Sequence, residues 1–178
     1  MVSESRTGHD LVDSLTDAVR EEWPGTDQTK FELTRRAARL ADLIEGALVD
    51  CLAPRDLTLA DYGVLTALRS VGEPYQLRPR EIQARLLLTS GGVSGVLNRL
   101  QKAGLIERHQ DANDKRSSWV RLTDAGAESA RATLRACAAV QSDVLRKVPD
   151  DIARRAADAL REVMLALEDT EPRDHRHT

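Results

Sequence analysis

The feature that most restricts the fold is one interruption in an otherwise helical pattern of apolar residues. On both sides of residues 105–122, apolar residues recur at steps of three and four, which is typical of amphipathic helices. Residues 105–109 and 118–122 instead have the length and alternation of two strands, and a polar, charged segment at residues 110–117 separates them. This order predicts a β-hairpin with a long tip. We therefore expect a mainly α fold with one small β-hairpin.

Residues that start or stop helices divide the rest of the chain. The apolar stripes cover residues 11–19, 33–51, 59–68, 82–86, 93–100, 127–144 and 152–167. Residues suited to helix N-termini precede four of these stripes: Thr58 with Asp61 as a capping box, Pro79, Thr89 or Ser90, and Thr123. The segment from Gly72 to Arg78 is expected to be a loop. The polar tail, residues 169–178, is expected to be disordered because it has nothing to bury.

Length and composition argue against several classes of protein. The 178 residues suffice for one well-packed domain with helical extensions. No apolar run reaches the roughly twenty residues of a membrane helix, and the polar N-terminus lacks a signal-peptide core. Two cysteines, Cys51 and Cys137, are too few for a disulfide framework. We expect a cytoplasmic protein without membrane contact; whether either cysteine senses oxidants stays open.

The net charge of −3 conceals an uneven distribution along the chain. Residues 78–121 hold nine Lys or Arg and four Asp or Glu. The flanks are acidic, with eight basic and fourteen acidic residues in 1–77 and nine and eleven in 122–178. A basic segment between acidic flanks is typical of a surface that contacts nucleic-acid phosphates. An ordinary solvated basic face is the alternative on charge alone.

The basic segment carries the order helix, short turn, helix, strand, charged loop, strand. Two helices joined by a short turn can place the second helix in the DNA major groove. Val93, Leu97 and Leu100 form the inward stripe of that second helix. Its opposite face, where Asn and Arg suit adenine and guanine edges, carries Gly92, Ser94, Gly95, Asn98, Arg99 and Lys102. The helix start offers hydroxyls and backbone N–H groups to a phosphate from Thr89, Ser90, Gly91 and Gly92.

The glycines of this helix need an explanation, because each costs about 1 kcal/mol relative to alanine. Close approach of the helix backbone to DNA at Gly91 and Gly95 is one explanation. Close packing between helices inside the protein is the alternative.

Three motifs follow one another in a specific order: residues 86–100, residues 103–108, and Asp114-Lys115-Arg116 followed by residues 120–126. Each motif alone is weak, whereas their order and spacing together are specific. In this arrangement the chain resembles the MarR family of winged helix-turn-helix transcriptional regulators, over about residues 31–168.

The resemblance implies a ligand-responsive repressor that binds one palindromic DNA operator as a homodimer. It implies a winged helix-turn-helix domain plus a helical dimerisation region. The expected parts are an N-terminal helical extension at 1–30, the dimerisation region at 31–56 and 123–168, the DNA-binding domain at 57–122, and the tail at 169–178. A dimer is also expected from the residues, because the Ala-rich terminal helices are too long to be buried in one small domain. Their packing on their own domain is the alternative.

The resemblance also assigns a role to the hairpin tip, called the wing. It implies that Asp114, Lys115, Arg116 and Ser117 lie at the DNA, with Arg116 in the minor groove and Asp114 orienting it. Gly95 stands where relatives often carry a longer polar side chain. Gly63 and Val96 stand where urate-responsive relatives, which share an N-terminal extension, have Asp and Arg. We therefore assign no effector.

Patterns typical of enzymes are missing from the sequence. It contains no phosphate loop, nucleophile elbow or paired carboxylates, and His175 and His177 have no third metal ligand beside them. We expect no catalysis, cofactor or metal. A winged-helix module that has lost DNA contact and binds proteins is the remaining alternative, against which Arg99, Lys102 and Arg116 argue.

Overall fold

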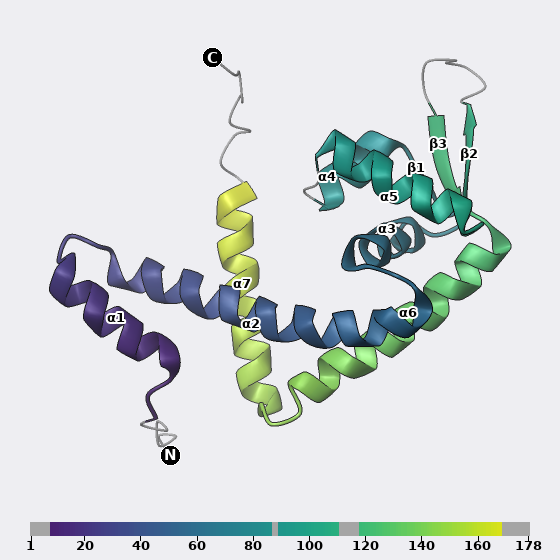
Figure 1. The fold of residues 1–178 in the computed structure, drawn as a ribbon. Helices are drawn as coiled ribbons and strands as arrows, with labels where there is room; N and C mark the ends of the chain where they lie inside the picture. The colour runs from purple at the N-terminus through teal and green to yellow at the C-terminus, as the bar shows by residue number, and fades with distance from the viewer. Residues whose placement is uncertain (1–7, 87–88, 111–117, 169–178) are drawn as a thin grey trace, which may run out of the picture. The chain divides into compact units, whose positions relative to one another are not determined.

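The computed structural model of the protein describes residues 8–86, 89–110 and 118–168. The elements in chain order are α1 Leu11–Glu22, α2 Gln28–Leu52, a 3₁₀ turn at Ala53–Arg55, α3 Leu59–Ser70, β1 Gln76–Leu77, α4 Pro79–Leu86, α5 Ser90–Lys102, β2 Ile106–Gln110, β3 Ser118–Leu122, α6 Asp124–Val144 and α7 Asp150–Glu168 (Figure 1). The predicted mainly α fold is confirmed. Residues 1–141 and 142–178 form two compact units, described separately here. The tail from residue 169 lies outside the described residues.

Polar side chains begin the helices where the sequence predicts them. Thr58 and Asp61 form the predicted capping box: Thr58 N donates to Asp61 Oδ2 at 2.8 Å, and Asp61 N donates to Thr58 Oγ1 at 3.2 Å. Thr89, rather than Ser90, is the N-cap of α5, since its Oγ1 accepts from Gly92 N at 3.2 Å. These bonds satisfy backbone N–H groups that a helix start leaves unpaired.

The predicted hairpin belongs to a sheet of three antiparallel strands in the order β1-β3-β2. β2 and β3 pair with Ile106 opposite Leu122. The expectation of a loop from Gly72 to Arg78 is wrong at Gln76–Leu77, which pair with β3 as β1. Two residues are too few to show an alternating pattern, so pairing with β3 creates this strand.

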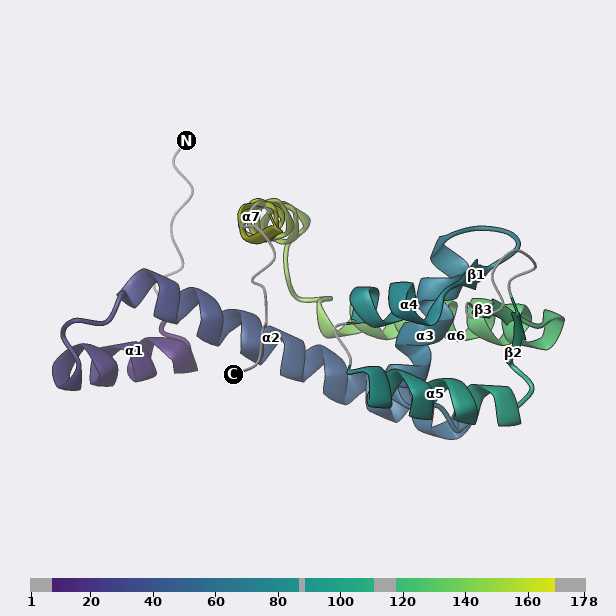
Figure 2. The ribbon, with the colours of Figure 1, turned by 90° about the horizontal axis from the view of Figure 1, so that it is seen from above.

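The hydrophobic core of the first unit lies among α3, α4, α5 and the sheet. Figures 1 and 2 show the three helices grouped beside the root of the β2–β3 hairpin. The fully buried side chains of this core are aliphatic, among them Val64, Leu65, Leu68, Ile82, Leu97, Leu100, Ile106 and Val120. The core thus fixes one face of α5 against α3 and α4.

Thr123 joins the end of α5, the sheet and the start of α6. Its Oγ1 donates to Gly104 O at 2.7 Å and accepts from Gly126 N at 3.0 Å, and its N–H donates to Leu105 O at 3.1 Å. A Cβ on Gly126 would lie 1.8 Å from Leu105 O, so only glycine fits there without a backbone shift. Three elements are therefore tied together at this joint.

α1 lies along α2, and charged side chains fasten the two helices (Figure 1). Arg36 of α2 donates to Asp10 at 2.9 Å and to Asp13 at 2.6 Å. The hydrogen bond from Arg36 lowers the pKa of Asp10. Large apolar side chains on the two helices and the turn between them stay exposed: Leu11, Leu15, Trp23, Leu33, Leu40, Leu43 and Val49.

A second, smaller apolar cluster joins the end of α2 to α6. Leu48 and Leu52 pack with Cys137, and Cys51 lies at the edge of the cluster. Cys137 is buried, whereas Cys51 is partly exposed. Burial, with a smaller contribution from Cys51, raises the pKa of Cys137 to about 11.

The second unit, residues 142–178, contains the end of α6 and α7. α7 has large apolar side chains that are exposed, among them Ile152, Leu160, Met164, Leu165 and Leu167. None of the helices in the described ranges has both the length and the apolar character needed to cross a bilayer.

Candidate nucleic-acid interface

The second helix of the predicted helix-turn-helix is α5, which packs against α3 and α4. The predicted inward residues Val93, Leu97 and Leu100 are confirmed, since none is more than 3% exposed. Val96 is also buried, which the sequence analysis missed although it lies three positions after Val93. One side of α5 is thus committed to the core.

The opposite side of α5 is exposed and carries the residues predicted to contact DNA: Gly91, Gly92, Ser94, Gly95, Asn98, Arg99 and Lys102. Thr89 is exposed just before the helix, and Ser90 is its first residue. A Cβ on Gly91 or Gly95 would have no heavy atom within 4 Å. Close packing within the chain therefore does not explain these two glycines.

Two polar side chains on this exposed face are held by other elements. Arg108 of β2 donates to Asn98 Oδ1 at 2.9 Å. Arg99 donates from Nη2 to Asp61 Oδ1 at 2.8 Å, and from Nε to both carboxylate oxygens at 3.1 Å. Asp61 is fully buried, whereas the Arg99 side chain is 49% exposed. The contact joins residues 38 positions apart, so no local pattern indicates it.

The wing is described only at its two strands. The Arg78 guanidinium lies 4.8 Å from the centroid of the Trp119 ring on β3, a cation–π contact. Arg121 of β3 donates from Nε to Glu107 Oε1 of β2 at 2.7 Å. The tip residues assigned to DNA, Asp114, Lys115, Arg116 and Ser117, lie outside the described residues, and their role stays a prediction.

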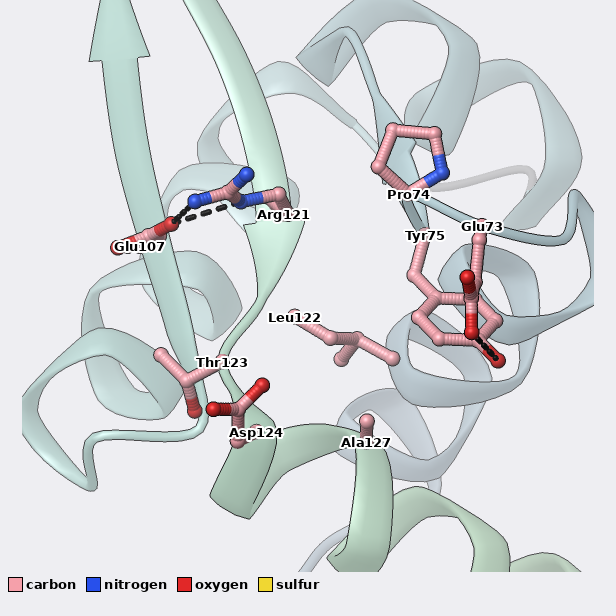
Figure 3. Close-up of a pocket in the computed structure, with 9 residues that line it drawn as sticks. All are labelled: Glu73, Pro74, Tyr75, Glu107, Arg121, Leu122, Thr123, Asp124 and Ala127. Atoms are coloured by element: carbon pink, nitrogen blue, oxygen red, sulfur yellow. Dashed lines mark hydrogen bonds and ion pairs between the residues drawn. The ribbon is translucent and has the colours of Figure 1, made fainter.

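An open pocket of about 530 Å³ lies at the root of the wing. Figure 3 shows Glu73 and Tyr75 on one side of it and the Glu107–Arg121 pair on the other. Tyr75 Oη donates to Glu73 Oε1 at 3.5 Å. None of the residues predicted to contact DNA lines this pocket. No group of three His, Cys, Asp or Glu side chains suited to a metal occurs in the described ranges.

A second pocket, of about 370 Å³, lies between α3 and α4 and is mostly apolar. It is lined by Tyr62, Gly63, Thr66, Ala67, Ser70, Arg85 and Leu86. Burial raises the pKa of Tyr62. Gly63 lines this pocket, where a Cβ would lie 2.9 Å from Leu86 Cδ2, and Val96 is buried in the core.

Comparison with known proteins finds similarity to one family of transcriptional regulators. The profile of the MarR family matches residues 55–117, which include α3, α4, α5 and β2. PecS of Dickeya dadantii, an HTH-type transcriptional regulator, is 29% identical over 115 residues, which cover 65% of this chain and 69% of PecS. The chain is therefore similar to MarR-family regulators over its helix-turn-helix and the first strand of the wing. The multiple antibiotic resistance protein MarR of Salmonella typhimurium is 37% identical over 76 residues, which cover 43% of this chain and about half, 51%, of that protein.

Solved structures of MarR-family proteins have the same fold. A mutant E. coli MarR in complex with operator DNA aligns with a TM-score of 0.67 at 24% identity, covering 87% of this chain and 99% of that one. BpsR of Bordetella bronchiseptica, whose DNA binding 6-hydroxynicotinic acid regulates, aligns with a TM-score of 0.67 at 19% identity, covering 75% and 98%. The predicted winged helix-turn-helix fold is confirmed. MarR-family proteins are transcriptional regulators rather than enzymes, in agreement with the sequence analysis.

Proposed function

We propose that this chain is a repressor of transcription that binds a palindromic DNA operator as a homodimer and responds to a small molecule. Its similarity to MarR-family regulators supports DNA-binding regulation. The operator complex of E. coli MarR and the regulation of BpsR by 6-hydroxynicotinic acid support the operator and the effector. The proposal includes the cytoplasmic location expected from the sequence.

The observation that carries DNA binding is the exposed face of α5. Its charged residues can neutralise phosphates, and its glycines let the helix backbone come close to a groove. Asn98 and Ser94 supply groups that can hydrogen-bond to base edges or phosphates.

Dimerisation is supported by apolar surface that the chain leaves uncovered. α1, α2 and α7 each expose several large apolar side chains. A second copy of the chain would remove such surface from water, which is the dominant favourable contribution to most protein association. In this proposal residues 31–56 and 123–168 form the dimerisation region.

The α3–α4 pocket is the proposed effector site. It lies directly against the helices of the helix-turn-helix, and its lining is apolar with a few polar groups, which is typical of small-molecule sites. A ligand there would contact Arg85 and Leu86 at the end of α4, immediately before the connection to α5.

Selection of binding sites from a random duplex library, using the full chain, tests the proposal. The selected motif should be palindromic, with half-sites centred about 10 to 10.5 base pairs apart or a multiple of that. Light scattering of the same sample should give a dimer.

Two variants serve as a matched pair in this assay. Lys102→Ala on α5 should weaken duplex binding, whereas Arg131→Ala, which removes another exposed charge, from α6, should leave it unchanged while light scattering finds the same dimer. A monomer that selects no motif would overturn the proposal and favour the protein-binding adaptor.

A further inference from the structure

We infer that Asp61 is a positioning residue for DNA recognition, which acts by holding Arg99 and so fixes the register of α5 against α3. The inference rests on the proposed function of α5. It also assigns Arg99 a phosphate contact through one edge of its guanidinium, in place of a role in reading bases.

The first observation is that both oxygens of the Asp61 carboxylate accept hydrogen bonds. Its Oδ2 accepts from Thr58 N at 2.8 Å and from Thr58 Oγ1 at 2.7 Å. Arg99 reaches both oxygens through Nε and reaches Oδ1 through Nη2. Arg99 Nη2 also donates to Thr58 Oγ1 at 3.1 Å. The capping box of α3 is thus extended by a residue from the recognition helix.

The second observation is that the N-terminal cap of α3 does not require a charged side chain at position 61. The amide oxygen of an asparagine can accept the same backbone bond without bringing a charge into the protein. Asp61 is fully buried, and a buried charge is costly unless it is paired and hydrogen-bonded. Among the described residues, its charged partner is the guanidinium of Arg99.

The third observation concerns the rest of the α3–α5 contact, which is aliphatic. Val93, Val96 and Leu97 of α5 belong to one cluster with Val64 and Leu65 of α3. Such contacts have no direction, so a shift of α5 along its axis by a fraction of its 1.5 Å rise per residue changes them little. A bidentate arginine–carboxylate pair permits one geometry. The pair therefore sets the height and rotation at which α5 presents its exposed face.

The remaining edge of Arg99 faces away from this pair. Nε and Nη2 are engaged, Nη1 makes no recorded bond to a described residue, and the side chain is 49% exposed. A guanidinium held in this way can donate to a phosphate oxygen. It cannot supply the two free N–H donors that a bidentate contact with a base needs.

The test compares binding of full-length variants to a selected operator and to an unrelated duplex of equal length, over a range of salt concentrations. Asp61→Asn should lower the affinity for the operator by about tenfold, the order of one misplaced base contact. It should not weaken binding to the unrelated duplex or flatten the salt dependence on that duplex, because every positive charge remains and one negative charge is removed. Arg99→Ala should weaken binding to both duplexes and reduce the slope of log affinity against log salt by about 0.9, the value for one phosphate.

Ala130→Gly is the control for a loss of stability alone. Ala130 is fully buried in α6 and belongs to the same core, yet it lies on neither of the two helices that the Asp61–Arg99 pair joins. This variant should melt at a lower temperature and keep the wild-type ratio of operator to unrelated binding while it is folded. All variants are measured at a temperature where circular dichroism shows them folded.

The possible outcomes distinguish a failure of the proposed function from a failure of the inference about Asp61. Failure of the wild-type chain to prefer any duplex overturns the proposed function. A wild-type chain that prefers its operator, with folded Asp61→Asn keeping that preference, overturns this inference alone. If Asp61→Asn does not fold, Arg99→Lys is used, because lysine keeps the charge but cannot form the bidentate pair. Loss of operator preference in Arg99→Lys with an unchanged salt slope supports the inference, and retention overturns it.

Discussion

Gly95 separates stability from function more sharply than any other residue of α5. It lies in the middle of this 13-residue helix, and a Cβ there would have no heavy atom within 4 Å. Gly95→Ala therefore adds a methyl group to solvent, without a clash and without a new contact. The substitution removes conformational freedom from the unfolded chain and so should stabilise the fold by about 0.4–1 kcal/mol. For a chain of this size that is a rise in melting temperature of about 1–4 °C.

The same methyl group should weaken operator binding. If α5 approaches the DNA through its exposed face, the space beside Gly95 is where the duplex lies. A loss of about 1 kcal/mol, or about fivefold in affinity, is the lower end for one disturbed base contact. Thermal melts and operator titrations on the one variant measure both effects.

Gly46→Ala is the matched control for this experiment. Gly46 lies inside α2, and a Cβ there also meets open space, so the gain in helix stability should be similar. Operator affinity should not change while light scattering finds the same dimer, because α2 carries none of the residues predicted to contact DNA. A lower melting temperature for Gly95→Ala, or a higher one with unchanged affinity, would show that Gly95 does not face the DNA.

Four further outcomes are expected. Duplex affinity should fall steeply with salt, by about 0.9 in log–log slope for each neutralised phosphate, and titrations at several salt concentrations that give a flat line would contradict the basic interface. Deleting Val144–Thr178 should abolish both the dimer and tight operator binding, and a truncated chain that light scattering finds dimeric would remove the C-terminal helix from the interface. Gly126→Ala should reduce the free energy of unfolding by about 1–3 kcal/mol or more, and so lower the melting temperature, because the new methyl group would clash with Leu105 O. An unchanged melting temperature would mean that the backbone can shift there without cost. Cys137, whose pKa is raised to about 11, stays protonated at pH 8, so maleimide labelling followed by mass spectrometry should modify it far more slowly than after unfolding, and equal rates would argue against its burial.

Local patterns in the sequence were sufficient for most of the fold. The capping box at Thr58 and the inward stripe of α5 depend on neighbours within four positions, and both are confirmed. Strand β1 could not be predicted, because Gln76–Leu77 become a strand only by pairing with β3, more than forty positions later.

The candidate site was predicted as a face of α5 but not as a set of contacts. Helical spacing places Arg99 on the exposed face, which the structure confirms. Spacing cannot show that its guanidinium turns back to a buried carboxylate on α3, because that contact depends on how two helices pack. From the sequence, Asp61 was therefore interpreted only as part of a helix cap. The assignment of Arg99 to base recognition took no account of its ion pair with Asp61.

The joint at Thr123 has a mechanical consequence. The Thr123 hydroxyl group forms hydrogen bonds with Gly104, just after α5, and with Gly126, in the first turn of α6. Leu105 O lies so close to Gly126 that there is no room for a side chain between them. α6 is about 32 Å long, at 1.5 Å per residue over its 21 residues, and this joint lies at its N-terminal end. A rotation of α6 about its own start would either break these hydrogen bonds or move Gly104 with it. The helical arms of the proposed dimer thus have a rigid linkage to the helices that would read the DNA.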